Sequence, residues 1–427
     1  MDHRFELFPK VVISNTVTQF KLRSLSKDII LNDDQAVLIR LSSLRRDNYQ
    51  GSYEASLDQV LMPIKGIVSL ELKCKGQQEH KLELIIPNQE TIEFRIYSLS
   101  KELWSLYPFK GDLHMHTTRS DGREEPGFVS SMCRQIGLDF MAITDHGQYE
   151  PSLEAIDLYK DLHLDLKMFP GEEVHGKNNA VHIINFGGNF SVNTWMREHP
   201  LELEKAIEIK KNRIQGVNDE QSRFEIACSE VIFDKIREGQ GLGIFCHPYW
   251  QIGSGYYISE EVTSYMLKHQ PYDAYEVIGG YHPYEQESNT LQIARYYEER
   301  AKGKEVPIVG VSDAHGCFNN LFGWFYTVVF SKSSQKEDLL NAIKSCRSVA
   351  IQDIPNSSPQ PVGPFEWVMY TLFLMREVFP LHDELCKIEG QLMMKHYEKD
   401  PMAKIELSKL KGQTQTLMDQ IYGRNHE

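Results

Sequence analysis

Hydrophobic and polar positions alternate in short runs over roughly the first hundred residues, with turn-forming polar stretches such as LNDD and PNQE between them. Alternation with a period of two is typical of strands that bury one face, and no convincing helical period appears between the runs. Six such runs predict a small β-sandwich-like domain over residues 1–105. They are VVIS from Val11, DIIL from Asp28, QAVLIRL from Gln35, GIVSLELKC from Gly66, HKLELII from His80 and TIEFRIYSL from Thr91.

From residue 106 onward, short apolar runs alternate with segments of helical period. This alternation indicates a parallel α/β sheet or barrel, and we expect it to extend over residues 106–352. The seven runs are FKGDLH ending near His114, LDFMAIT from Leu138, LKMFPG from Leu166, AVHIINF from Ala180, GLGIFC from Gly241, YDAYEVI from Tyr272 and VPIVGVS from Val306.

Three further segments depart from this pattern. An insert between the fourth and fifth runs, about residues 188–240, has a helical pattern and is placed to cover a site at the mouth of the barrel. Residues 353–363 contain SSPQPVGP and predict a Pro-rich linker. Residues 364–427 carry apolar positions at helical spacing, which predicts a helical extension that packs on the barrel or on a second copy of the chain.

Composition narrows the class of protein. With 41% hydrophobic and 25% charged residues, the 427-residue chain is typical of globular proteins. Its net charge of −14 argues against nucleic-acid or acidic-membrane binding through a broad basic surface, although it leaves a nucleic-acid substrate open. The seven scattered cysteines form no C-x-x-C pair, the amino terminus lacks the apolar core of a signal peptide, and no run is long enough for a membrane span. We therefore expect a soluble cytoplasmic protein with reduced thiols.

Side chains that can bind metal ions occur at or near the end of every predicted barrel strand. In (β/α) barrels the reacting groups project from the carboxyl ends of the strands. A single histidine on an apolar run is more often a core or edge residue than a ligand, but coincidences at the ends of seven runs favour a metal site. In chain order the candidates are His114, His116, Asp145, His146, Glu172, Glu173, His182, His247, Glu276, Asp313 and His315.

The densest of these stretches is GDLHMHTTRSDG, residues 111–122. A His-x-His pair arises readily by chance, but on a strand His114 and His116 would share one face with their Cα atoms about 7 Å apart. Both imidazoles would then reach one cation, and Asp121 follows in a loop able to fold back over the same end. Imidazole and carboxylate ligands without cysteine suit Zn, Mn or Fe.

The motifs DLHMHTTRSDG, AITDHG, PGEEVHG, VHIINFG, IFCHPYW and VGVSDAHG, in this order, resemble those of the polymerase and histidinol phosphatase (PHP) metallohydrolases. The resemblance covers about residues 108–352. The preceding β domain and the closing stretch VVFSKSSQKEDLLNAIKSCRSVAI look like the carbaryl-hydrolase-like branch of that superfamily. The resemblance implies a distorted seven-stranded (β/α) barrel that holds two or three divalent metal ions at its mouth.

Position by position, the resemblance implies three groups of metal ligands. Glu173 is preferred to Glu172 because the family pattern is Gly-x-Glu and Gly171 sets the register; adjacent residues of a strand also point to opposite faces. Glu173 belongs to the first group and bridges to the second. The first group is His114, His116, Glu173 and Asp313, the second adds His182 and His247, and the third is Asp121, His146 and His315.

Clustered divalent ions predict a hydrolase. The primary hypothesis is hydrolysis of a small phosphate ester by a hydroxide that bridges two metals. The alternatives are a metal-dependent hydrolase of carbamate or carboxylic esters, which the narrower branch suggests, and a non-catalytic scaffold stabilised by metals. The complete set of ligand residues argues against the scaffold.

Two further residues are candidates for the chemistry. Arg119 could pair with phosphate oxygens of the substrate or be a solvent-exposed loop arginine, and the sequence favours neither. His282, within GGYHPYE, is a candidate acid for the leaving group. Asp145 is a candidate partner for a ligand imidazole, and Glu276 could support a ligand or lie at the edge of the core.

Overall fold

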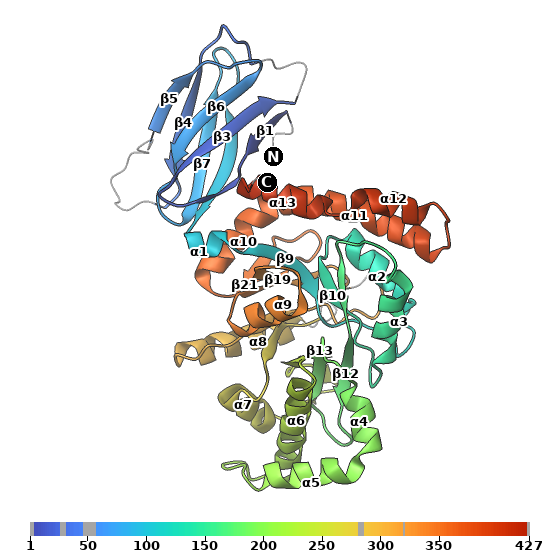
Figure 1. The fold of residues 1–427 in the computed structure, drawn as a ribbon. Coiled ribbons are helices and arrows are strands. Elements are labelled where there is room, and N and C mark those ends of the chain that lie inside the picture. Colours follow the sequence, from blue (N-terminus) through green and yellow to red (C-terminus); the bar gives the residue numbers. More distant parts are fainter. Residues whose placement is uncertain (1–3, 26–30, 46–56, 281–285, 319–320, 425–427) are drawn as a thin grey trace. The chain divides into compact units, whose positions relative to one another are not determined.

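The computed structural model describes residues 4–25, 31–45, 57–280, 286–318 and 321–424, and these fold into two compact units. Unit 1 comprises Met1–Tyr107, Met369–His382 and Gly412–Glu427, and unit 2 comprises Pro108–Val368 and Asp383–Lys411. The chain therefore crosses from one unit to the other four times. Figure 1 shows the course of the chain through both units.

Unit 1 contains two sheets of strands that bury alternate side chains. The smaller sheet has the order β1-β3-β6 and the larger has the order β2-β8-β7-β4-β5 (Figure 1). Apolar side chains of both sheets form one buried core, as the period of two predicts. The strands are β1 Phe5–Phe8, β2 Val11–Ile13, β3 Val17–Ser24, β4 Val37–Ser43, β5 Leu57–Leu61, β6 Ile67–Lys73, β7 Gln78–Ile85 and β8 Ile92–Leu99.

The sequence pattern found five of these eight strands. The predicted run from Asp28 falls almost wholly on residues 26–30, outside those that the structure describes. The pattern missed β1, β3 and β5. In β3 the polar residues at alternate positions are exposed, with Phe20 and Leu22 buried between them.

Unit 2 contains two mixed sheets covered by helices. The six-stranded sheet has the order β11-β10-β9-β19-β20-β21, and the five-stranded sheet has the order β12-β13-β14-β17-β18. A short hairpin, β15-β16, stands apart from both sheets. The strands are β9 Tyr107–Asp112, β10 Phe140–Ala142, β11 Lys167–Phe169, β12 Gly171–His175, β13 His182–Phe186, β14 Leu242–Phe245, β15 Gln251–Ile252, β16 Gly255–Tyr256, β17 Ala274–Ile278, β18 Ile308–Gly310, β19 Phe325–Ser331, β20 Ser348–Gln352 and β21 Gln360–Val362.

The described strands of unit 2 form two mixed sheets, and the expected distorted seven-stranded barrel is not confirmed. Isolated bridges, Met115 with Ala314 and His146 with Glu173, lie between segments that adjoin the two sheets. The run LKMFPG, expected as one strand, ends at Pro170, and a new strand, β12, begins in the other sheet. Proline has no N–H to continue a ladder, which is consistent with a break at this point.

Strand direction also differs from the expectation. The β13 strand runs antiparallel to both β12 and β14, whereas β14, β17 and β18 are parallel. His182 is the first residue of β13 and lies directly opposite His175, the last residue of β12. His182 therefore lies at the same edge of the five-stranded sheet as the residues that follow β14. It does so as the first residue of an antiparallel strand, whereas the sequence placed it at or near the end of a parallel one.

Helices connect these strands and make up the carboxyl-terminal part of the chain. The insert predicted to be helical contains α4, α5 and α6. The helices are α1 Lys101–Trp104, α2 Pro126–Gln135, α3 Glu150–Tyr159, α4 Val192–Glu198, α5 Pro200–Lys211, α6 Glu220–Glu238, α7 Glu260–His269, α8 Gln286–Ala301, α9 Lys336–Lys344, α10 Phe365–Glu377, α11 Phe379–Tyr397, α12 Ala403–Leu410 and α13 Gln413–Tyr422. Among the described residues, no helix combines the length and the apolar character that crossing a membrane requires.

Two predicted segments at the carboxyl terminus have a different organisation in the structure. The linker expected at residues 353–363 contains strand β21, which pairs with β20. The helical extension expected at residues 364–427 does not form a unit of its own, because it divides between units 1 and 2. The seven cysteines all lie in described residues, and none of them forms a disulfide.

Candidate metal centre

Four donor atoms meet in the interior of unit 2, from residues that follow β9 and β18 and from the middle of β12. The Nε2 atom of His114 lies 3.4 Å from Glu173 Oε2 and 3.2 Å from Asp313 Oδ1. The Nε2 atom of His116 lies 3.4 Å from the same Glu173 oxygen and 3.0 Å from the same Asp313 oxygen. These four residues are the first predicted ligand group.

The spacing of these atoms suits a small divalent cation. Zinc binds imidazole nitrogen and carboxylate oxygen at about 2.0–2.2 Å, which separates neighbouring ligands of a tetrahedral site by about 3.4 Å. The four separations given above span 3.0–3.4 Å. The donor set therefore has the size of a metal site without any movement of the backbone.

The second carboxylate oxygen of Glu173 faces a different pair of histidines. His182 Nδ1 lies 2.9 Å and His247 Nε2 lies 3.7 Å from Glu173 Oε1. Each oxygen of this one carboxylate thus faces its own group of imidazoles, which is the geometry that a bridging ligand requires. These are the residues of the second predicted group.

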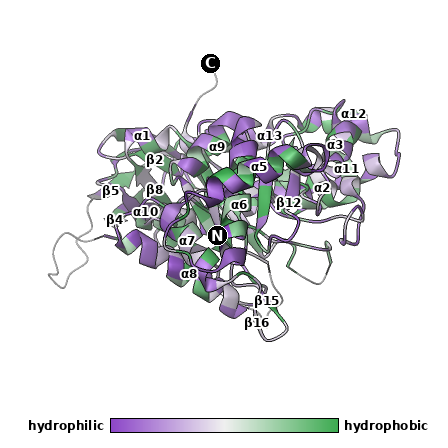
Figure 2. Ribbon diagram, turned by 90° about the horizontal axis from the view of Figure 1, so that it is seen from below, coloured by the Kyte–Doolittle hydropathy of each residue, from purple (hydrophilic) through white to green (hydrophobic). Residues whose placement is uncertain are grey.

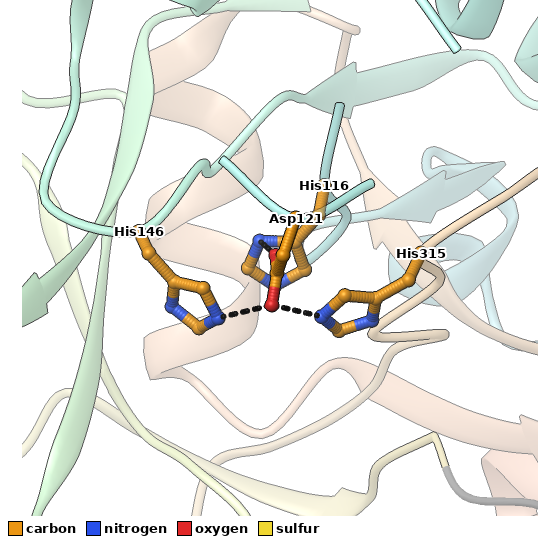
Figure 3. A group of neighbouring side chains, drawn as sticks. All are labelled: His116, Asp121, His146 and His315. Atoms are coloured by element: carbon orange, nitrogen blue, oxygen red, sulfur yellow. Dashed lines mark ion pairs between the residues drawn. The ribbon is translucent and has the colours of Figure 1, made fainter. Parts of the chain in front are cut away.

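The third predicted group lies nearer the surface, around Asp121. Figure 3 shows the Asp121 carboxylate between the imidazoles of His146 and His315, with His116 beside them. Asp121 Oδ2 lies 3.4 Å from His146 Nε2 and 3.3 Å from His315 Nε2. The structure thus brings the donor atoms of all nine predicted ligands into three adjoining groups.

Several polar atoms at this site are buried without a hydrogen bond. Both Glu173 oxygens and the Nε2 atom of His114 are buried and make no hydrogen bond of good geometry to any described residue. A buried carboxylate is costly unless positive charge lies beside it. Here His146 Nδ1 lies 2.6 Å from Glu173 Oε2, and a bound cation would offset the cost further. The oxygen and imidazole donors suit zinc, manganese or iron, as the sequence predicts.

Opposing electrostatic effects act on these side chains. Burial lowers the pKa of His146, but the Glu173 and Asp121 carboxylates outweigh it and raise that pKa to about 9. Burial lowers the pKa of His182 to about 4 against the opposing effect of Glu173. Burial would raise the pKa of Glu173, but His114 and His182 hold it well below its usual value. The central carboxylate therefore stays ionised, as a metal ligand must.

Unusual backbone conformations aim three of these ligands. His247 and Asp313 follow the ends of β14 and β18 with positive φ angles of 24° and 50°. Such angles are uncommon for residues other than glycine and concentrate at functional sites. The loop that carries Asp121 closes at Gly122, where a Cβ atom would lie 2.5 Å from the His116 carbonyl oxygen. Only glycine allows this loop to fold back over the strand end.

Two buried acids contact a predicted ligand and the loop that follows it. The imidazole of His114 donates from Nδ1 to Glu276 Oε2 over 3.1 Å, which leaves its Nε2 for the metal group. Asp145 accepts from the Thr117 backbone N–H over 2.7 Å and from the Ser120 hydroxyl over 2.5 Å. Asp145 was predicted to orient a ligand imidazole. The hydrogen bonds that it accepts come instead from the loop that contains Thr117 and Ser120.

Glu172 faces away from the histidines. It accepts hydrogen bonds from the Val192 backbone N–H over 2.6 Å, the Ser191 hydroxyl over 2.7 Å and the Asn185 amide over 3.0 Å. These partners lie on β13 and at the start of α4, where a carboxylate satisfies the free N–H groups of the helix. Glu172 therefore binds neighbouring backbone and side-chain groups while Glu173 faces the histidines, as the alternation of side chains along a strand predicts.

Arg119 is held by carboxylates of the protein itself. Its guanidinium donates to both Glu154 oxygens over 2.7 and 2.9 Å and lies 2.7 Å from Glu125 Oε2. Its side chain is 37% exposed, so these are surface ion pairs. A contact with substrate phosphate stays a prediction, and His282 lies outside the described residues.

His175 belongs to the surroundings of the site although the ligand set omits it. Its Nε2 lies 2.9 Å from His146 Nδ1 and 3.6 Å from Glu173 Oε1. It shares a face of β12 with Glu173, two residues away, and this spacing is visible in the sequence. The motif PGEEVHG therefore carries a further donor beyond the glutamate.

No protein-family model matches the chain. The DNA polymerase/3'-5' exonuclease PolX of Bacillus subtilis is 49% identical over 57 residues, which are 13% of this chain and 10% of that protein. A two-domain protein from Bacteroides vulgatus that contains a predicted PHP-like metal-dependent phosphoesterase is 16% identical, with a TM-score of 0.39 over 58% of this chain and 65% of that one. The lesion-specific endonuclease PfuEndoQ of Pyrococcus furiosus is 14% identical, with a TM-score of 0.32 over 60% of this chain and 58% of that one.

Each of these matches leaves more than a third of the other protein's length uncovered. Over part of its length, the chain is similar to a PHP-like protein. The carbaryl-hydrolase-like branch stays a prediction.

Proposed function

We propose that this chain is a PHP-type metal-dependent hydrolase of phosphate esters that acts on a small phosphorylated substrate. The observation that carries the proposal is the position of Glu173, whose two buried oxygens face His114 and His116 on one side and His182 and His247 on the other. A purely structural carboxylate would be expected to accept hydrogen bonds, as Glu172 does.

The nine predicted ligands would hold two or three divalent ions of zinc, manganese or iron. Such ions activate a water molecule at neutral pH and stabilise charge on the leaving oxygen of an ester. The protein contributes the spacing of the donors, the ionised state of Glu173 and the orientation of the imidazoles. Glu276 fixes the ring of His114, and the backbone carbonyl of Asp313 lies 2.8 Å from His315 Nδ1.

Arg119 and His282 are the proposed contacts to the substrate outside the ligand set. Arg119 lies in the loop between His116 and Asp121. Its guanidinium could therefore contact a phosphate oxygen that is bound near Asp121. It would have to leave Glu154 or Glu125 to bind that phosphate. His282 would protonate the leaving oxygen.

The test is metal analysis of the purified full chain together with assays on a phosphate monoester, a phosphodiester and an aryl carboxylic ester. We expect bound zinc, manganese or iron and turnover of a phosphate ester that a chelator abolishes. His114→Ala and Asp313→Ala should lose both metal and turnover. Turnover of the carboxylic ester alone would replace the proposal with the carboxylic or carbamate ester hydrolase, and bound metal without any turnover would favour the scaffold.

A further inference from the structure

An aromatic hairpin lies directly beside the second ligand group. Strands β15 and β16 form this hairpin, which begins four residues after His247. The ring of Trp250 is centred 5.8 Å from the imidazoles of both His182 and His247, and the ring of Tyr257 is centred 5.7 Å from His182. The two aromatic rings are 5.3 Å apart with an angle of 69° between them. We call this pair the aromatic corner.

Backbone hydrogen bonds hold the aromatic corner in place. The Trp250 N–H donates to the His247 carbonyl over 3.0 Å, and the Tyr257 N–H donates to the Trp250 carbonyl over 2.8 Å. Gly253 makes the tight turn with a φ of 64°, and Ile258 buries its side chain just after the hairpin. The rings are therefore fixed relative to the metal ligands.

Core packing does not account for these rings. Tyr257 leaves 42% of its surface exposed, and Trp250 is half-buried. Figure 2 shows the hairpin extending clear of α7 and α8 at the lower edge of the view. Exposed aromatic rings that contact a polar site are typical of ligand binding, because a flat ring gains contact area at little cost in side-chain entropy.

We propose that the aromatic corner binds a flat ring carried by the alcohol part of the substrate, which rests on the function proposed above. The substrate class is then a phosphate ester whose leaving alcohol bears a planar ring, either a nucleobase or an aryl group. Stacking on Trp250 or Tyr257 needs no charge, so it suits a molecule whose anionic end is held by the metal centre. An aliphatic ester would leave these exposed rings without a partner.

The test compares substrate pairs that share a reacting centre and differ in the ring. Adenosine 5′-monophosphate is paired with ribose 5-phosphate, and benzyl phosphate with cyclohexylmethyl phosphate; each pair has a primary alcohol as leaving group. We expect the member with the planar ring to have a kcat/KM about tenfold higher, mainly through KM. A preference in the first pair only would identify a nucleobase, and a preference in both would identify flat rings in general.

Variants of the aromatic corner locate the effect. Trp250→Leu and Tyr257→Leu should lower kcat/KM more for the member with the planar ring than for the ringless member, and so remove most of that preference. Tyr257→Phe should retain the preference, and Ile252→Ala, on the same hairpin, should behave like the wild type. Metal content and thermal midpoint are measured for each variant, because the rings also contact His182 and His247. Equal kcat/KM for both members of each pair in the wild type would overturn the proposal.

The aromatic corner can be tested separately from the proposed hydrolase activity. If no phosphate ester is hydrolysed, calorimetric binding of adenosine 5′-monophosphate and ribose 5-phosphate to the metal-loaded protein still tests the aromatic corner. Tighter binding of the nucleotide that Trp250→Leu abolishes would support the corner while the hydrolase is rejected. Equal binding of both compounds would overturn the corner as well.

Discussion

The Nδ1 atom of the His114 imidazole lies 3.1 Å from Glu276 Oε2, and both side chains are fully buried. His114 comes from the end of β9 and Glu276 from the middle of β17, in different sheets of unit 2. The pair therefore ties the orientation of a predicted ligand to the opposite sheet. This geometry fixes which nitrogen of the ring faces Glu173 and Asp313.

Loss of Glu276 should weaken metal binding without removing any ligand. We expect Glu276→Ala to lower metal affinity by about 10–100-fold, because the His114 ring loses the partner that fixes its orientation. Glu276→Gln keeps an acceptor oxygen and should lose less. Competition titration with a chromogenic chelator measures both variants, and wild-type affinity in Glu276→Ala would show that this hydrogen bond has no part in metal binding.

The two neighbouring glutamates should give opposite results. Glu173→Gln should lose bound metal, because it removes the carboxylate whose two oxygens face the first and second groups of imidazoles. Glu172→Gln should keep metal but lower the free energy of unfolding by about 1–3 kcal/mol, since its hydrogen bonds to β13 and α4 are disturbed.

Metal analysis and denaturant unfolding in the presence of a chelator separate the two effects. Each variant is the matched control of the other, because the residues are adjacent and the chemical change is the same. Full metal content in Glu173→Gln would contradict its assignment as a bridging ligand.

Arg119 offers a test of phosphate recognition. Arg119→Ala should change stability little, since it removes only exposed ion pairs with Glu154 and Glu125. If Arg119 binds phosphate, KM for phosphate esters should rise about tenfold or more while metal content stays constant. Glu154→Ala is the control, because it removes one of the two carboxylates that hold the guanidinium and should not raise KM. An unchanged KM in Arg119→Ala would leave it as a surface residue.

The stability of the β sandwich should fall in mild acid because of His80. This histidine on β7 is buried between the hydroxyls of Ser43 and Ser98, and burial lowers its pKa to about 4. The unfolded chain, with an ordinary pKa of about 6.5, binds a proton below that pH, which the folded chain does not. Stability should therefore decrease from about pH 6.5 to about pH 4, by roughly 3 kcal/mol at most, and the loss should level off below that.

The control for this effect is His80→Gln, which keeps a polar side chain but does not titrate. Denaturant midpoints of both proteins between pH 4 and pH 7.5 give the difference that belongs to His80, because other titrating groups are common to both. Parallel pH profiles of the two proteins would contradict the assignment.

The structure brings together the nine ligand candidates that the sequence proposed, and their role as metal ligands stays a prediction. The nine ligand candidates could be found because metal ligands are polar residues in apolar surroundings, so each interrupts a hydrophobic run at a recognisable place. His175 shows the limit of this approach: it has the same spacing from Glu173 as His116 has from His114, but only the folded chain places it 2.9 Å from His146.

By itself, the sequence determined which segments are strands or helices in most of unit 2, where the predicted metal ligands lie. It also determined that Glu172 and Glu173 point to opposite faces of their strand. These are local properties, since periodicity and chain stereochemistry fix them. Only the tertiary structure decided that the strands divide into two sheets, that β13 runs antiparallel, and that the carboxyl-terminal helices divide between the two units. Strand direction and partner choice depend on contacts between residues far apart in the chain, which no local pattern records.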